Sequence, residues 1–218
     1  ILKELTTKQI FIFFSVCFVS FGLLLIFLTS FAGRDDAGTV FKGAVQFNAG
    51  NFSLIKPGAY FFRYPHQLGL LSFERLVLYL IPLPVISVFY VLNLGMVIGM
   101  NYATWKITEE LFQRPLVSRT AVIMSFGFLP LVFNIMFAYG LMYGLFFGSF
   151  AILFFLRYLR RGKVRNAILS VLMLTLAYWV RSNNIILIIA LSGILILLTL
   201  REKRYRYLLL VLAFFAFP

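Results

Sequence analysis

The chain has 218 residues, of which 62% are hydrophobic and 12% are charged, and its formal net charge is +13. Because soluble domains carry about one quarter charged residues, this composition and a mean hydropathy of +0.97 exclude an ordinary soluble domain and indicate an integral membrane protein. The basic residues flank apolar runs, so membrane orientation explains the positive charge better than nucleic-acid binding does. One His and the single Cys17 argue against a zinc site and exclude an internal disulfide.

The first apolar run, Ile10–Gly33, carries no charged residue and exceeds the roughly 20 residues that a membrane helix needs. It is too long for the core of a signal peptide and has no clear cleavage site, so we expect a retained helix. Asp35 and Asp36 follow almost at once. A carboxylate pair at the membrane face suits chemistry on a substrate that is half lipid and half polar. The alternative is that one Asp simply caps the next helix.

Residues 33–75 form the only long loop, which we expect to contain amphipathic helices. Apolar residues recur at near-helical spacing from Val40 to Phe47, and Gly50 offers a stop. The sequence therefore predicts an amphipathic helix on the membrane surface. The Asp pair lies at its N-terminus, where negative charge meets the helix dipole favourably.

The end of this loop leads into the second span. The helix is expected to restart at or just after Pro65, which places His66 and Gln67 in a first turn facing an outer cavity. His66 is either a substrate contact or an interfacial hydrogen-bonding residue. Glu74 and Arg75 are interpreted as an exposed ion pair.

Leu76–Trp105 is the second predicted span. Pro82 and Pro84 near its start indicate a bend between an interfacial helix and the span proper.

Two later runs, Thr120–Leu156 and Asn166–Leu200, are too long for one crossing at about 1.5 Å per residue. Basic clusters flank both ends of each run. Each is therefore predicted to be a helical hairpin, with its outer turn near Asn134–Tyr143 in the first and at Arg181–Asn184 in the second. A last helix begins at Leu208.

The fold class predicted is all-α: a polytopic transmembrane helical bundle with six spans and the start of a seventh. The N-terminus is cytoplasmic in this topology, because 14 of the 20 Lys and Arg residues then lie inside, as the positive-inside rule requires. The other six lie outside: Arg34, Lys42, Lys56, Arg63, Arg75 and Arg181.

Arg181 lies between two short apolar runs, where an arginine is costly unless it faces water, a partner or an anion. With Asn183 and Asn184 beside it, this tip could bind a lipid-linked phosphate. The alternative is a turn with a snorkelling arginine.

The order of these features resembles the GT-C superfamily of integral membrane glycosyltransferases, which includes protein mannosyltransferases and lipid A aminoarabinose transferases. The matching motifs are Asp35-Asp36 after the first span, the surface helix, Tyr64–Gly69 and Arg181–Asn184. Tyr64–Gly69 is similar to bacterial members from Gram-positive cell-envelope systems. Residues 1–218 would then be the N-terminal part of a GT-C-like domain. The acidic motif departs from the family's spaced form, and there is no second Pro after Pro65.

The resemblance implies sugar transfer from a polyprenyl-phosphate donor to a polymer, lipid or protein acceptor of the cell envelope on the extracytoplasmic face, usually with inversion. Asp36 is the favoured base and Asp35 the second choice. No cofactor is expected, and a divalent ion bridging the carboxylates and phosphate ranks below direct base catalysis. The remaining site residues are Arg181, Arg63 and Lys56 for the donor phosphate, with Lys42 as a further cation, and Tyr64, His66, Gln67, Asn183 and Asn184 for substrate.

Two other functions stay open. A transporter or flippase for lipid-linked sugars would place its site near the bilayer midplane, whereas the polar groups here gather outside. A non-catalytic membrane subunit would tolerate neutral residues at positions 35 and 36. A channel fits least, because charged or amide rings inside the spans are missing from the sequence.

Overall fold

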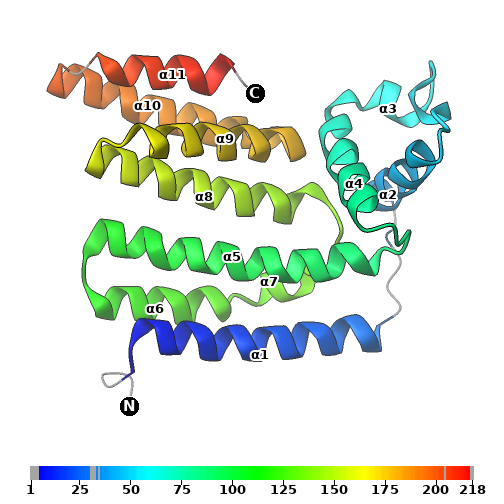
Figure 1. Cartoon of the computed structure of the whole chain (residues 1–218), viewed down its shortest axis with the longest axis horizontal. Helices are drawn as coiled ribbons and strands as arrows, with labels where there is room; N and C mark the ends of the chain where they lie inside the picture. Colours follow the sequence, from blue (N-terminus) through cyan, green and yellow to red (C-terminus); the bar gives the residue numbers. More distant parts are fainter. Residues whose placement is uncertain (1–4, 30–32, 34, 204, 217–218) are drawn as a thin grey trace.

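The computed structural model describes residues 5–29, 33, 35–203 and 205–216. Over these ranges the chain forms eleven α-helices and three 3-10 helices, and no strand occurs in them. This confirms the all-α class. Figure 1 shows most of the long helices side by side in one layered bundle, with a smaller group of helices, α2 to α4, across one end of it.

Helix α1 (Thr7–Leu28) begins three residues before the predicted start. The early start has a local cause: Thr6 and Gln9 form a capping box, in which each side chain satisfies the other residue's backbone N–H. The predicted continuation of this helix through residues 30–32 lies outside the described residues.

The group at the end of the bundle, here called the end group, contains the predicted amphipathic helix. This helix is α2 (Asp35–Asn48), and its apolar face packs on α4 (Leu68–Leu80). Gly50 follows the helix with a φ of +82°, which confirms the predicted stop. Between α2 and α4 lie three short elements: η1 (Ser53–Ile55), α3 (Tyr60–Arg63) and η2 (Pro65–Gln67).

The second predicted span is divided between two helices. Helix α4 ends at Leu80, and α5 (Ser87–Phe112) starts after a stretch that contains Pro82 and Pro84. A helix is disfavoured before a proline, and this explains the break. The predicted bend is confirmed, but the predicted start at Leu76 is wrong because that residue belongs to α4.

The first predicted hairpin corresponds to α6 (Pro115–Phe126), the short α7 (Leu129–Asn134) and α8 (Gly140–Arg161). The predicted reversal of the chain is confirmed, but the expected packing of the two arms on each other is wrong, because α5 lies between α6 and α8 and packs on both (Figure 1). The chain turns at residues 135–139, inside the predicted range. The buried Asn93 side chain on α5 holds this turn, since its Nδ2 donates to the carbonyl oxygens of Ile135 (2.9 Å) and Phe137 (3.2 Å).

The second hairpin is formed by α9 (Val164–Val180) and α10 (Ile185–Glu202), joined by η3 (Ser182–Asn184). The predicted tip is therefore confirmed, and α11 (Arg206–Ala216) follows. Three helical segments among the described residues are long and apolar enough to cross a membrane: Thr7–Leu28, Gly140–Arg161 and Ser182–Glu202. This supports a membrane protein.

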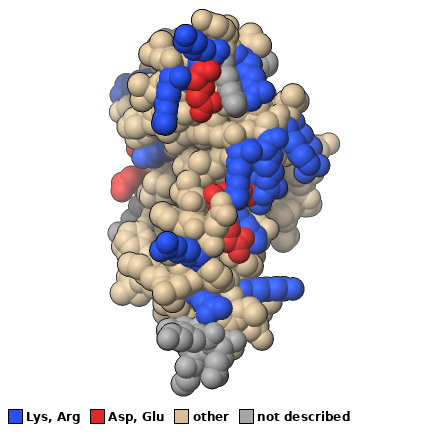
Figure 2. All heavy atoms as spheres, turned by 90° about the vertical axis from the view of Figure 1, so that its left-hand side faces the viewer, with Lys and Arg blue, Asp and Glu red and all other residues tan. Residues whose placement is uncertain are grey.

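The bundle end opposite the end group is basic. Figure 2 shows this end, where Lys and Arg side chains gather over the surface. Glu110, whose side chain is 7% exposed, pairs there with Arg157 (3.2 Å), Arg160 (3.2 Å) and Arg161 (2.5 Å).

Candidate functional site

A polar cavity of about 210 Å³ lies where the end group meets the tip of the second hairpin. In a chain this apolar, a cavity with a mainly polar lining stands out as a candidate ligand site. It brings together two sequence motifs that are more than 100 residues apart. Its lining residues are His66, Gln67, Tyr139, Val180, Arg181, Ser182 and Asn183.

Glycines allow the elements around this cavity to approach closely. A Cβ atom on Gly69 would lie 1.8 Å from the carbonyl oxygen of Trp179, and one on Gly140 would lie 2.3 Å from that of Val180. Neither separation is sterically tolerable, so both positions require glycine. The starts of α4 and α8 consequently pack directly on the last turn of α9.

Tyr139 connects the two motifs. The buried Gln67 donates from Nε2 to the Tyr139 hydroxyl oxygen. On the other side, the Arg181 guanidinium carbon lies 4.9 Å from the centroid of the Tyr139 ring, within the range of a cation–π contact. Arg181 is half-buried and is therefore held in place before any ligand binds.

Asp35 and Asp36 both lie exposed at the start of α2, and Asp35 has a φ of +52°. Of the two carboxylates, Asp36 is the one that interacts with the Tyr60 side chain. The Tyr60 hydroxyl is buried and makes no hydrogen bond of good geometry. Burial raises the pKa of the Tyr60 hydroxyl well above its usual value, and the Asp36 carboxylate adds to this effect. Tyr139 and Tyr64 make smaller contributions in the same direction. Tyr60 thus interacts both with Asp36 and with Tyr139, a residue of the cavity lining.

Other predicted substrate residues surround this arrangement. The exposed Tyr64 ring lies 5.0 Å from the Tyr60 ring and 6.1 Å from His66, measured between centroids. Asn183 is exposed and lines the cavity. Asn184 instead points inward, where its Nδ2 donates to the Ala177 carbonyl oxygen at 2.8 Å. Its amide therefore completes the end of α9.

The remaining predicted cations lie apart from the cavity lining. Lys42, Lys56 and Arg63 are exposed on α2, before α3 and at the end of α3, respectively. Of the predicted phosphate-binding residues, the cavity lining includes Arg181 alone.

Sequence reasoning missed Tyr139, Tyr60 and Ser182 as residues of this site. Tyr139 stands beside Gly140 in the predicted outer turn, and this Tyr-Gly pair was the available signal. Nothing in the sequence indicated that the turn would reach Gln67.

The predicted exposed ion pair of Glu74 and Arg75 is wrong. Glu74 is fully buried, and neither carboxylate oxygen has a hydrogen-bond partner. Burial raises the pKa of this carboxyl well above its usual range. Arg75 turns the other way, and its Nε donates to Asn48 Oδ1 at 3.2 Å. The two side chains diverge because α4 packs between α2 and α9. The pattern of charges in the sequence does not reveal this packing.

Among the residues described, no three His, Cys, Asp or Glu side chains gather into a potential metal site. The chain matches no protein-family profile, no curated protein sequence and no solved structure. The case for a function therefore rests on the cavity and on the sequence motifs that form it.

Proposed function

We propose that the chain is part of a GT-C-like membrane glycosyltransferase that moves a sugar from a polyprenyl-phosphate donor to an acceptor on the extracytoplasmic face. One observation carries the proposal: Arg181, His66 and Gln67 line one polar cavity. Tyr60 links this cavity to a carboxylate, because it interacts with both Asp36 and the lining residue Tyr139. The cavity thus offers a cation and hydrogen-bond donors for a phosphate, with a carboxylate close by.

The proposed topology has six crossings and the beginning of a seventh. In chain order these are α1, α5, α6 with α7, α8, α9 and α10, with α11 starting the last. The basic end of the bundle would face the cytoplasm and the cavity the opposite side, in keeping with the positive-inside rule. Residues 33–75 would form the extracytoplasmic loop.

The reaction would be a single displacement. The acceptor hydroxyl oxygen attacks the anomeric carbon opposite the phosphate, the bond from that carbon to the phosphate oxygen breaks, and the configuration inverts. Asp36 accepts the proton of the attacking hydroxyl. Arg181 stabilises the charge that develops on the departing polyprenyl phosphate, and its fixed position over Tyr139 limits the reorganisation required.

The prenyl tail of the donor has a candidate path. An apolar groove of about 670 Å³ runs between α4, α5 and α8, with Val77, Val88 and Phe146 in its lining. Helices α4 and α8 also pack around the polar cavity at their starts. The phosphate would then lie at headgroup depth and the tail among apolar side chains, so positioning would supply part of the rate.

The test is sugar transfer in vesicles that contain the protein and a polyprenyl-phosphate sugar. Asp36→Asn should lower the rate about 10²- to 10⁴-fold, because the general base is lost. Asp35→Asn is the matched control and should lower it less, since Asp35 is not the carboxylate beside Tyr60.

Full activity of both variants and of the double variant would exclude this mechanism. Movement of the donor across the vesicle membrane without transfer would favour the flippase alternative instead. If the vesicles show neither movement of the donor nor transfer of the sugar, a non-catalytic subunit is favoured.

A further inference from the structure

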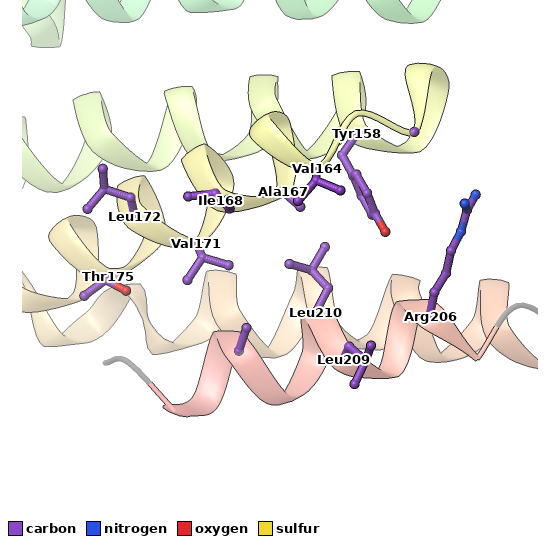
Figure 3. Close-up of a pocket in the computed structure, with 12 residues that line it drawn as sticks. Tyr158, Val164, Ala167, Ile168, Val171, Leu172, Thr175, Arg206, Leu209 and Leu210 are labelled. Atoms are coloured by element: carbon purple, nitrogen blue, oxygen red, sulfur yellow. The ribbon is translucent and has the colours of Figure 1, made fainter.

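A second groove, of about 640 Å³, lies between α9 and α11 at the basic end of the bundle, away from the polar cavity. Figure 3 shows Val171 of α9 and Leu210 of α11 projecting into it from opposite sides. Its lining is almost wholly apolar, and its volume is within the roughly 300–1,000 Å³ typical of ligand sites. Within the proposed membrane span such a groove faces hydrocarbon, so an apolar chain is the natural occupant.

The length of the groove matches one leaflet of a bilayer. Along α9 the lining runs from Val164 to Thr175, which is about 17 Å at about 1.5 Å per residue. The hydrocarbon core is about 30 Å thick, so one leaflet accounts for about 15 Å. The groove is therefore suited to one acyl chain that enters from the basic end.

The mouth of the groove is positively charged. Arg206 and Tyr158 lie at one end in Figure 3, and Leu172 and Thr175 lie at the other. None of the described carboxylates forms an ion pair with Arg206, whose guanidinium lies 5.6 Å from the centroid of the Tyr207 ring. Gly162 also lines the mouth, and the exposed Lys163 follows it directly in the chain.

We propose that this groove binds an anionic phospholipid, with one acyl chain between α9 and α11 and the headgroup phosphate at Arg206. The charge at the mouth selects the anionic headgroup, because a basic residue near the membrane surface attracts anionic lipid. The groove is only about as long as one leaflet, so it fits the acyl chain of a lipid better than a partner helix that spans the whole membrane. The site is independent of the proposed sugar transfer, but it rests on the proposed membrane span, because only there does the groove face hydrocarbon.

The test compares phosphatidylglycerol with phosphatidylcholine of the same acyl chains, added to the protein in a neutral detergent. Native mass spectrometry counts the retained lipid, and thermal unfolding gives an independent measure of binding. The wild-type protein should retain phosphatidylglycerol preferentially and unfold at a higher temperature with it. Inorganic phosphate alone should produce neither effect, because the acyl chain supplies most of the contact.

Two substitutions separate the headgroup from the chain. Arg206→Gln should weaken phosphatidylglycerol binding about fivefold and remove the preference over phosphatidylcholine. Ala167→Phe should fill the groove and abolish retention of both lipids, and Ala213→Phe does the same from α11 if the first variant does not fold. Arg201→Gln and Leu212→Phe are matched controls that lie outside the lining and should bind as the wild type does.

Equal retention of the two lipids by the wild-type protein would overturn the proposal. So would undiminished binding by both Arg206→Gln and a groove-filling variant. Stabilisation by inorganic phosphate alone would show an anion site without a lipid, which also contradicts it.

Discussion

The Arg181 guanidinium carbon lies 4.9 Å from the centroid of the Tyr139 ring, and the hydroxyl of the same tyrosine accepts a hydrogen bond from Gln67. The Tyr139 side chain therefore contacts both Gln67 and Arg181, which belong to two motifs more than 100 residues apart in the sequence. No described carboxylate forms an ion pair with Arg181, so its charge is available to a ligand. This relationship leads to the first prediction.

Tyr139→Leu should weaken phosphate-donor binding and sugar transfer more than Tyr139→Phe does. Leucine removes the ring under Arg181, a contact of about 0.5–2 kcal/mol, and also the hydrogen bond to Gln67. Phenylalanine keeps the ring and loses only the hydrogen bond, about 1 kcal/mol. Steady-state transfer kinetics would measure the difference. Equal losses in the two variants would show that the ring does not position Arg181.

The glycines of the cavity give a second prediction. Gly69→Ala and Gly140→Ala should each destabilise the fold by about 1–3 kcal/mol and lower activity, because the new methyl group would overlap a carbonyl oxygen of α9. Gly95→Ala is the matched control. Nothing lies within 4 Å of a Cβ there, so it should be neutral or stabilising by up to about 1 kcal/mol. Thermal unfolding in detergent measures all three, and stability of Gly69→Ala equal to that of the control would refute the packing.

Local signals were enough to predict much of the fold. The proline pair before α5, the basic clusters and the stop at Gly50 each act over a few residues, so most helices and the two chain reversals followed from them. The insertion of α5 between α6 and α8 did not follow, because it depends on tertiary packing. The position of His66 and Gln67 in a turn before α4 followed from Pro65 in the same way.

Contacts between distant elements could not be predicted. Glu74 appeared to be a surface residue, yet it is buried where α4 meets its neighbours. Tyr139 became part of the site only because Gly140 lets the start of α8 approach the end of α9. Both outcomes depend on tertiary packing, which a single sequence does not specify residue by residue.

Glu74 gives a pH-dependent prediction. Its pKa is raised in the folded protein by burial, so folding favours the protonated carboxyl. The free energy of unfolding is therefore highest below the pKa of Glu74 in the unfolded chain, about 4.3, where the carboxyl is protonated in both states. It falls as the pH rises through the raised pKa of Glu74 in the folded protein. Glu74→Gln should therefore gain stability over the wild type as the pH rises.

Unfolding temperatures of Glu74→Gln and the wild type, measured in detergent between about pH 4 and pH 9, would test this predicted gain. Glu109→Gln is the control, because the Glu109 carboxylate is partly exposed and pairs with Lys106 at 2.8 Å. That variant should show no growing advantage at high pH. A constant difference between Glu74→Gln and the wild type at every pH would argue against a buried, protonated Glu74.

The proposed orientation is testable with cysteine labelling. In a Cys17→Ser background, Asn183→Cys should react with a membrane-impermeant maleimide applied outside intact cells. Lys163→Cys, at the basic end, should react only after the membrane is opened. Both positions are exposed on the protein, so access depends on the side of the membrane. The reverse pattern would place the cavity in the cytoplasm and exclude extracytoplasmic transfer.

The central claim is that Arg181 and Asp36 act on one lipid-linked phosphosugar, and release of polyprenyl phosphate in vesicles tests it most directly. Release coupled to the inverted glycoside product should be seen with the wild-type protein. Arg181→Gln should lower the rate of release about 10²- to 10³-fold, as loss of a charge-stabilising group does. Asp36→Asn should lower it at least as much, whereas Arg201→Gln should not. Wild-type rates in both Arg181→Gln and Asp36→Asn would contradict the account.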